Sequence, residues 1–525
     1  AALAVGSIAL TGMPVHVVTV NDYLAERDAQ TMTPIYHFLG LKVGVVVNVT
    51  TSDARHEAYQ CDITYCTNKE LAFDYLKDRV ALMKNGGAMQ MALDALQGVA
   101  SNKPRLLLRG LYFAIVDEAD SIFVDEAVTP LILSTVISGT QESEIYQTMI
   151  EFAKTLQEGV DYVQHERERR IEITSAGKIC LNTFAQERSG VWASARARLE
   201  LLNQALSALY LFERDQQYVV ANGKIAVVDE FTGRVLADRS WENGLHQMIE
   251  AKEGCALSDR RITLARITYQ RLFRRYMMLA GMTGTAQEVA SEIWAVYQLR
   301  TVSIPLHRPS RRLHFLGHLH PTAQSKWTAI VDRVRTIALG EGRSVLIGTR
   351  SVESSEQLSQ VLQAAGIEHV LLNAKQDRAE ADAIALAGRP GRVTVATNLA
   401  GRGTDIHLDP RVVDCGGLHV ILTECHSSAR VDRQLIGRGA RQGDPGSYEM
   451  IVSIDDDILR IYSSLLIKLV RPWVNRGSSH SKWLLPLLRR WAQARAQRHD
   501  SQSRRAMLKG DKQLDKALSF SGLQE

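Results

Sequence analysis

Short apolar runs recur along the chain, and longer amphipathic stretches separate them. The runs that are rich in β-branched residues lie at 15–20, 43–47, 113–116, 345–347, 393–396 and 419–422. The stretch 351–365 repeats apolar residues at spacings of three and four, which predicts a helix. Continuous apolar strands that alternate with amphipathic helices are typical of parallel sheets with helices on both faces. The pattern therefore predicts an α/β fold.

The strand-like runs fall into two sets, which predicts two α/β domains in tandem. Mixed patterning interrupts the first set and predicts an inserted α+β domain, whose charged run at 165–170 is interpreted as a hairpin rim or a solvated face. A stretch with prolines and arginines reads as the linker between the two domains. The predicted boundaries are 1–133 and 214–304 for the first α/β domain, 134–213 for the insert, 305–312 for the linker that opens the second α/β domain (305–460), and 461–525 for a basic helical segment.

Composition narrows the class of protein. Of the 525 residues 45% are hydrophobic and 23% are charged, which is ordinary for a globular protein. There are 62 Lys and Arg against 58 Asp and Glu, so the net charge of +4 gives no overall polycation that would suggest a nucleic-acid partner. The six cysteines form no CxxC pair and no Cys/His cluster at zinc spacing, which predicts a reducing compartment and no zinc site.

The two ends of the sequence differ in character. The first 20 residues are apolar but begin at Ala1 without a basic flank, so we expect no signal peptide and interpret them as part of a longer chain. No stretch approaches the roughly 20 uninterrupted apolar residues of a membrane-spanning helix.

Residues 461–516 hold thirteen Lys and Arg against three Asp, a local charge of +10. Trp473, Trp483 and Trp491 interleave with these charges, which fits either an anionic membrane surface as partner or a packing helix with a solvated basic face.

The segment AIVDEAD at 114–120 is an apolar strand that ends in adjacent carboxylates. The carboxyl ends of parallel strands form the edge of a sheet where ligands bind. At that edge Asp117 can hold Mg²⁺, and Glu118 can orient and deprotonate the attacking water in nucleotide hydrolysis. Acidic pairs after strands are also common without a catalytic role, so a second motif has to support this interpretation.

Two glycine-dense segments in the second half supply that support: ATNLAGRGTD at 396–405 and QLIGRGARQG at 434–443. Glycines allow the backbone to approach a phosphate, and Arg438 and Arg441, three residues apart, can share one helical face. An arginine that reaches across a cleft stabilises the charge that develops on a transferred phosphoryl group. The alternative is a pair of surface arginines beside a turn.

Many segments of the chain, in order from residue 15 to residue 447, resemble the preprotein translocase ATPase SecA, a superfamily 2 motor with helicase-like domains. They include VHVVTVNDYLAERDA, CDITYCTNKELAFDYLKD, VDEADSIFVDEAVTPLILS, VVDEFTGR, WENGLHQMIEAKEG, GMTGTA, VLIGTRSVESSE, ATNLAGRGTDI and QLIGRGARQGDPGS. The resemblance implies two tandem RecA-like motor domains, an insert that corresponds to the family's preprotein cross-linking domain, and a C-terminal segment like the start of its helical scaffold.

Two features depart from the family's pattern. No GxxxxGK[ST] phosphate loop occurs in this sequence, although the family carries one shortly before VHVVTV. We expect the loop to be encoded before Ala1, because the acidic pair and the arginines are intact; without it this chain would hydrolyse ATP poorly or not at all. The sequence also has no match to the family's wing domain or cysteine-rich zinc tail, so we interpret it as a short, divergent member.

The resemblance assigns roles residue by residue. Asp117 would coordinate Mg²⁺, and Glu118 would be the general base. Thr283, Gly284 and Thr285 would couple the nucleotide state to domain closure. The remaining assignments are Gly401, Arg402, Gly403 and Asp405 at the cleft, Arg438 and Arg441 as finger arginines, Gln434 as a sensor of the γ-phosphate, and Thr19, Asn21, Asp22 and Arg27 as links between the first sheet and the cleft.

The implied function is an ATP- and Mg²⁺-dependent motor that moves unfolded preproteins through a SecYEG-like channel at the cytoplasmic membrane, with no specific nucleic acid as partner. Two other functions stay open. A superfamily 2 nucleic-acid helicase shares the motor domains, although the DEAD-box type has no insert at this place. A client-binding paralogue that does not hydrolyse ATP would also fit the sequence as it stands.

Overall fold

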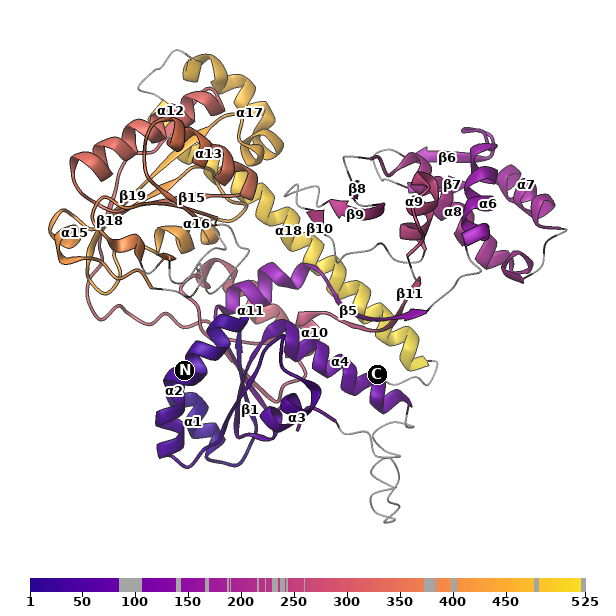
Figure 1. Ribbon diagram of the computed structural model, residues 1–525, viewed down its shortest axis with the longest axis horizontal. Coiled ribbons are helices and arrows are strands. Elements are labelled where there is room, and N and C mark those ends of the chain that lie inside the picture. Colours follow the sequence, from indigo (N-terminus) through magenta and orange to yellow (C-terminus); the bar gives the residue numbers. More distant parts are fainter. Residues whose placement is uncertain are drawn as a thin grey trace. The chain divides into compact units, whose positions relative to one another are not determined.

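Figure 1 shows the computed structural model of the chain. The structure describes residues 1–84, 106–137, 143–165, 170–186, 188, 190–214, 217–221, 223–228, 235–236, 241, 244–258, 260–372, 383–384, 386–397, 403, 405–475 and 481–520. The chain divides into two compact units. The first contains Ala1–Ile132 and Ala265–Glu525, and the second contains Leu133–Leu264.

The first unit opens with a five-stranded sheet in the order β12-β4-β1-β3-β2, in which every pairing is parallel. Its strands are β1 (Val15–Thr19), β2 (Val43–Val46), β3 (Ile63–Thr67), β4 (Phe113–Val116) and β12 (Met278–Gly281). β1, β3 and β4 are buried at every position, as expected of continuous apolar runs in a sheet that is covered on both faces. We call this sheet and its helices the first lobe.

The helices of the first lobe alternate with its strands. They are α1 (Ala2–Ala9), α2 (Asp22–Phe38), α3 (Ser52–Gln60), α4 (Asn68–Lys84), η1 (Ser121–Asp125), η2 (Glu126–Val128), α10 (Tyr269–Phe273), η5 (Gln287–Val289) and α11 (Ala290–Tyr297). The helix α2 begins where Asn21 Oδ1 accepts a hydrogen bond from Leu24 N at 3.0 Å. This cap fixes the direction in which α2 leaves the edge of β1.

A second parallel sheet of seven strands forms the second lobe, in the order β13-β19-β18-β15-β17-β16 with β14 also paired to β19. Its strands are β13 (Arg311–His314), β14 (His318–His320), β15 (Val345–Thr349), β16 (Val370–Leu372), β17 (Val393–Thr397), β18 (Leu418–Leu422) and β19 (Pro445–Ser453). Its helices are α12 (Ala323–Val334), η6 (Arg335–Gly340), α13 (Val352–Ala364), η7 (Leu386–Gly388), α15 (Pro410–Asp414) and α16 (Ala429–Ile436).

Alternate residues of the second sheet enter two separate cores. Leu346 packs in one buried cluster, whereas its neighbours Val345 and Ile347 pack in another on the opposite face. Two such parallel sheets in tandem, each with helices between its strands, confirm the predicted α/β fold with two RecA-like lobes.

The second unit is mixed α and β. Its elements are α6 (Ser143–Lys154), β6 (Tyr162–His165), β7 (Arg170–Ile173), α7 (Ser175–Ala185), η4 (Gly190–Ala193), α8 (Ala195–Tyr210), β8 (Tyr218–Ala221), β9 (Lys224–Val228), β10 (Val235–Leu236) and α9 (Leu245–Glu253). The paired strands β5 (Leu131–Ile137) and β11 (Arg260–Ile267) lead the chain into this unit and out of it. The unit ends at Leu264, beyond the predicted end of the insert at 213. The reason is that Tyr218 and Met248 are buried in the same core as Met149 and Leu202.

Two helices complete the first unit: α17 (Asp457–Asn475), which is interrupted by non-helical dihedral angles at Ser463, and α18 (Ser481–Phe520). Leu485, Leu488 and Ala492 of α18 are buried in the core of the second lobe. Further along the same helix, Arg504 Nε donates to Glu292 Oε1 of the first lobe at 2.6 Å. Among the described residues, no helix combines the length and apolar character needed to cross a bilayer.

Candidate functional site

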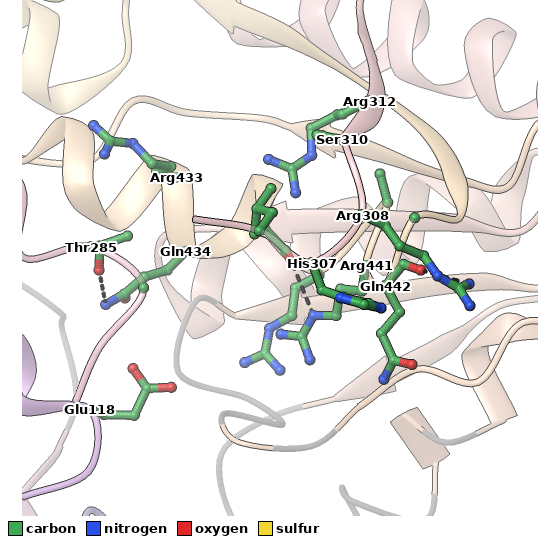
Figure 2. Close-up of a pocket in the computed structure, with 16 residues that line it drawn as sticks. Glu118, Thr285, His307, Arg308, Ser310, Arg312, Arg433, Gln434, Arg441 and Gln442 are labelled. Carbon is green, nitrogen blue, oxygen red and sulfur yellow. Dashed lines mark hydrogen bonds between the residues drawn. The ribbon is translucent and has the colours of Figure 1, made fainter. Parts of the chain in front are cut away.

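A cavity of about 810 Å³ opens within the first unit, with walls from both lobes. The first lobe contributes Glu118 and the loop that carries Gly284 and Thr285. The second lobe contributes α16 and the segment 437–443, which we call the arginine turn. Figure 2 shows several arginine side chains gathered around this cavity, and Glu118 facing them. The arginines that line it are Arg308, Arg312, Arg433, Arg438 and Arg441.

The charge of this lining fits a polyanion, because Glu118 is the single acidic side chain among the described residues that line it. The sequence-predicted residues that the cavity brings together are Glu118, Gly284, Thr285, Gln434, Arg438 and Arg441.

Glu118 occupies a tight turn at the carboxyl end of β4. Asp117 N still donates to Val18 O of β1 at 2.8 Å, so the sheet continues to that residue. Glu118 then adopts a left-handed conformation with φ of 47°, and Ala119 N donates to Met282 O at 2.9 Å. A left-handed non-glycine residue costs about 1–3 kcal/mol and persists when its surroundings hold it. The turn therefore directs the Glu118 side chain toward the cavity, as seen in Figure 2.

Asp120, two residues later, is completely buried and is the acceptor for several donors. Its Oδ1 accepts from Thr283 Oγ1 at 2.6 Å, and its Oδ2 accepts from Thr285 Oγ1 at 2.8 Å. The same Oδ2 accepts from Gln434 Nε2 of α16 at 2.7 Å. One carboxylate of the first lobe thus joins the GMTGTA loop to a helix of the second lobe.

Arg430 of α16 pairs with the same carboxylate and with Asp125. Its side chain is almost fully buried. Burial alone would lower the pKa of Arg430, but Asp125 and Asp120 outweigh it and the pKa is raised. A buried charge without its partner costs several kcal/mol, so these ion pairs fix the position of α16 against the first lobe. The exposed side of the helix adds an ion pair between Arg433 and Glu288.

The prediction that Arg438 and Arg441 share a helical face is wrong. Helix α16 ends at Ile436, and both arginines lie in the turn that follows. In this turn Ala440 and Gln442 take left-handed conformations, with φ of 55° and 52°. Both side chains nevertheless line the cavity.

Arg441 is held by two contacts within the second lobe. Its Nε donates to Gly437 O at 3.0 Å, and its Nη1 lies 2.8 Å from Asp405 Oδ1. Asp405 therefore lies beside Arg441 and forms an ion pair with it. Gly401 and Arg402, which the sequence also placed here, lie outside the described residues.

The predicted links from the first sheet divide into two groups. Arg27 Nη1 of α2 donates to Gly403 O of the second lobe at 2.9 Å. Thr19, Asn21 and Asp22 instead hold the start of α2: Thr19 Oγ1 donates to Asn21 O at 3.1 Å, and Asp22 Oδ2 accepts from Asn48 N at 3.2 Å. Of these four residues, Arg27 is the one whose described contacts include the second lobe.

Sequence reasoning assigned no role to Asp120 or Arg430. Asp120 stands inside the AIVDEAD segment, next to the residues that were singled out. Arg430 stands four residues before Gln434, so both occupy the same face of a helix, and this spacing could have identified it.

The donor set at the end of β4 fits Mg²⁺. Within the described part of the chain no group of three or more His, Cys, Asp or Glu side chains could hold a metal ion. Mg²⁺ bound with a nucleotide typically takes one or two carboxylates, with phosphates and waters as the remaining ligands. Asp117, at the end of β4 and next in the chain to the cavity-lining Glu118, is a carboxylate of this kind.

The fold and the site define an α/β protein with two RecA-like lobes around a cationic cavity. The SecA DEAD-like domain family matches residues 1–294, and the SecA P-loop domain family matches residues 309–412 and 409–472. The chain is similar to protein translocase subunit SecA 2 of Nitrosospira multiformis, with 48% identity over 98% of this chain and 77% of that protein. The corresponding protein of Bordetella avium is 49% identical over 99% of this chain and 79% of its own length.

A longer relative matches over less of its length. Protein translocase subunit SecA of Clostridium kluyveri is 45% identical over 87% of this chain, and the match spans 52% of that protein. On these matches the chain belongs to the SecA family.

Proposed function

We propose that the chain is an ATP-driven motor that moves unfolded preproteins across the cytoplasmic membrane through a protein-conducting channel. The observation that carries this proposal is the cationic cavity with Glu118 on one wall and Arg438 and Arg441 on another. Asp120 supports it, because its hydrogen bonds give the two lobes a shared contact close to that cavity. The protein would act in the cytoplasm, in peripheral association with the membrane.

The residues divide the chemistry among them. Asp117 would hold Mg²⁺, which would neutralise charge on the phosphates when it is bound with ATP. Glu118 accepts a proton from the attacking water, and its turn at the end of β4 sets the direction of that transfer. Arg438 and Arg441 stabilise the charge that develops on the transferred phosphoryl group.

Arg441 has to exchange its partner during this cycle. Its guanidinium pairs with Asp405, and the two side chains are 38% and 36% exposed. An exposed ion pair of this kind is worth about 0.2–1 kcal/mol, so a phosphate group can replace the carboxylate at little cost. Asp405 then holds the arginine ready between turnovers.

Coupling to movement passes through α16. Gln434 contacts both Asp120 and Thr285, with Nε2 of Gln434 lying 3.2 Å from Thr285 Oγ1. A change in lobe spacing on hydrolysis would alter these bonds and would displace the helix that precedes the arginine turn. We propose that this displacement drives a client polypeptide gripped by the insert. The client varies in sequence, so backbone hydrogen bonds to strand edges would hold it.

A second candidate function is a SecA-like protein that binds clients without hydrolysing ATP. Superfamily 2 helicase activity is the third possibility, because nucleic-acid motors share the two-lobed arrangement.

Steady-state ATP hydrolysis by the product of the complete gene distinguishes these functions. The proposed motor hydrolyses ATP faster when an unfolded polypeptide is added, and single-stranded RNA leaves the rate unchanged. Binding of the polypeptide without hydrolysis would favour the client-binding paralogue. Stimulation by RNA, lost at high salt, would favour the helicase. The Glu118→Gln variant, which should not hydrolyse ATP, is the control for contaminating ATPases.

A further inference from the structure

The linker between the lobes runs beside the arginine turn. Residues 301–310 contain no helix or strand, and the chain then enters β13, an edge strand of the second sheet. β13 pairs in parallel with β19, so that Arg311 lies beside Pro445 and Arg312 beside Gly446. The arginine turn leads directly into the start of β19. The strand that follows the linker is therefore the neighbour of the strand that follows the arginine turn.

Arg312 makes the strongest contact between them. Its Nη2 donates to Gly439 O, in the middle of the turn, at 2.9 Å. The Nε of Arg312 is buried and has no hydrogen-bond partner among the described residues. Burial, and repulsion from Arg441, lower the pKa of Arg312. Burying a guanidinium whose Nε has no hydrogen-bond partner costs free energy, and an arginine in solvent has no such cost.

Arg308, in the linker segment without helix or strand, makes a second contact with the arginine turn. Its Nη1 lies 3.4 Å from Gln442 O. Its side-chain carbons cover Gly443, where a Cβ would come within 2.9 Å of Arg308 Cδ. Gly443 has φ of +88°, a conformation that favours glycine, and a larger residue would also displace the Arg308 side chain.

The turn needs such contacts because its own conformation is unfavourable. Ala440 and Gln442 are left-handed non-glycine residues, and each costs about 1–3 kcal/mol. Within the turn, Arg441 Nε donates to Gly437 O at 3.0 Å, and directly after it Asp444 N donates to Arg441 O at 2.8 Å. Contacts from Arg312 and Arg308 outside the turn add to these bonds in holding the turn and the two arginines that it carries.

We infer that Arg312, with support from Arg308, is a positioning residue that holds the arginine turn and thereby places Arg438 and Arg441 at the cavity. The linker is the covalent connection between the lobes, so this contact ties the position of the finger arginines to the path of the linker. The structural part of the inference stands on the contacts alone. Its consequence for hydrolysis rests on the proposed function.

Hydrogen exchange of the full chain tests the structural part without any nucleotide. In Arg312→Gln we expect the amides of 439–444 to exchange about tenfold faster, the change produced by losing one charge-assisted hydrogen bond. The matched control is Arg311→Gln, because Arg311 is the exposed neighbour on the same strand and does not line the cavity. Arg312→Lys should restore much of the protection, since an ammonium group can also donate to Gly439 O.

The outcomes that would overturn the inference are specific. Equal exchange in Arg312→Gln and Arg311→Gln would remove any special role for Arg312. Faster exchange that extends to β15 and β18 would mean that Arg312 supports the whole sheet and not the turn. If Arg312→Gln does not fold, Arg308→Ala alters an exposed side chain, and the turn amides should then exchange about threefold faster.

Steady-state kinetics test the consequence for hydrolysis. Arg312→Gln should lower kcat about tenfold and leave KM within a factor of two. In an Arg441→Ala background the same substitution should lower kcat by less than twofold, because its effect is exerted through the turn. If the double variant instead lost kcat by the product of the two single-variant factors, the two residues would act independently, and the positioning role of Arg312 would be overturned. If the parent protein does not hydrolyse ATP, the proposed function fails, and the exchange experiment still decides the structural claim.

Discussion

Gln434 Nε2 on α16 lies 2.7 Å from Asp120 Oδ2 in the turn after β4, so a helix of one lobe hydrogen-bonds to a buried carboxylate of the other. The same carboxylate accepts from Thr283 and Thr285 and pairs with Arg430. Asp120 therefore contacts both lobes, whereas the role that we propose for Asp117 and Glu118 is in the chemistry. This division gives adjacent acidic residues different roles, and each role can be tested by itself.

Asp120→Asn should uncouple the lobes. The amide keeps the size of the side chain but removes the negative charge that partners Arg430, and it directs an NH₂ group at other donors. We expect a loss of about 1–3 kcal/mol in unfolding free energy and at least a tenfold fall in ATP hydrolysis. Chemical denaturation and steady-state ATPase assays measure the two effects.

The matched control for this substitution is Asp457→Asn, which changes an exposed carboxylate in α17 and should leave stability within about 0.5 kcal/mol. Wild-type hydrolysis by Asp120→Asn would show that the shared carboxylate has no part in the cycle.

Glu118→Gln should block the chemical step and spare nucleotide binding. Glutamine has the same shape and can hold the left-handed turn, but it does not accept a proton from water. A positioned general base contributes about 10²–10⁴-fold, so kcat should fall by that range. Equilibrium binding of a fluorescent ATP analogue should change by less than threefold. A large loss of affinity would instead assign Glu118 to binding.

Part of each sheet could be predicted from the sequence, because strands such as β1, β4 and β15 are continuous apolar runs. The edge strands β13 and β14 have no such run, and the pattern did not predict them. The run at 15–20 became β1 and the run at 393–396 became β17, at the expected positions in parallel sheets. The site residues Glu118, Gln434 and Arg441 line one cavity. Glu118 comes after β4, whose position the pattern predicted, whereas Gln434 lies within α16 and Arg441 in the turn after that helix.

The remaining features depend on tertiary contacts that no local pattern records. Asp120 and Arg430 are 310 positions apart, and their pairing becomes visible once the lobes meet. Helix α16 ends at Ile436, and Ala440 and Gln442 in the turn after it are left-handed, although neither residue type signals that conformation. The sequence pattern places Arg312 in a polar linker and gives no sign that its guanidinium donates to Gly439 O.

Asp405→Asn should release Arg441 from its partner. The pair is more than one third exposed, so its loss should change the unfolding free energy by less than about 1 kcal/mol. Arg441 would then reach an anion without first leaving a carboxylate, and nucleotide affinity should rise about two- to tenfold. Titration with the fluorescent ATP analogue at fixed salt gives this number. Weaker binding would mean that Asp405 itself contacts the nucleotide.

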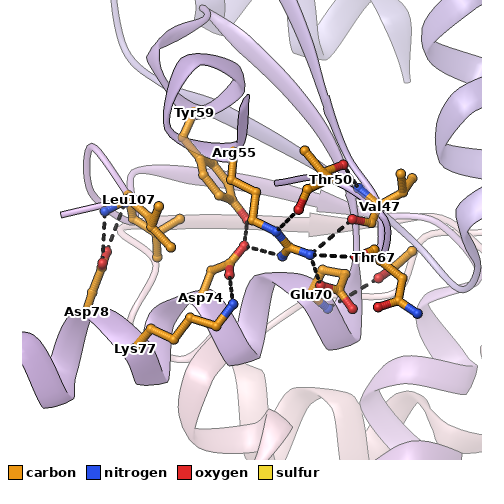
Figure 3. A network of polar contacts seen from close by, with 12 residues as sticks. Val47, Thr50, Arg55, Tyr59, Thr67, Glu70, Asp74, Lys77, Asp78 and Leu107 are labelled. Atoms are coloured by element: carbon orange, nitrogen blue, oxygen red, sulfur yellow. Dashed lines mark hydrogen bonds and ion pairs between the residues drawn. The ribbon is translucent and has the colours of Figure 1, made fainter. Parts of the chain in front are cut away.

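A buried network around Arg55 should dominate the stability of the first lobe (Figure 3). Arg55 Nη1 lies 2.8 Å from Asp74 Oδ2, and Tyr59 Oη donates to the same oxygen at 3.1 Å. Asp74→Ala leaves the buried guanidinium with one carboxylate fewer, so we expect a loss of about 3–5 kcal/mol. Lys77→Ala removes the half-exposed partner of Asp74 and should cost less than about 1 kcal/mol. Urea denaturation compares the two, and similar losses would contradict the distinction.

His16 should make the first lobe less stable in acid. It lies on β1, fully buried, with Nδ1 2.6 Å from Tyr276 Oη. Burial, with a smaller contribution from Arg109, lowers the pKa of His16 to about 4. Above pH 6.5 the imidazole is neutral in the folded and the unfolded chain. Between pH 6.5 and 4 the unfolded chain binds a proton that the folded chain excludes, so stability falls as the pH falls, and below 4 the contribution levels off.

The expected loss over this interval is roughly 3 kcal/mol, and substitution isolates it from other titrating groups. His16→Gln can keep a hydrogen bond to Tyr276 but carries no titrating group, so its unfolding free energy should depend less steeply on pH between 6.5 and 4 by that amount. His37→Gln, at an exposed position near the end of α2, is the control for removal of a histidine. Urea denaturation at a series of pH values gives both slopes. Parallel curves for the parent chain and His16→Gln would show that His16 takes up its proton in the folded state as readily as in the unfolded state.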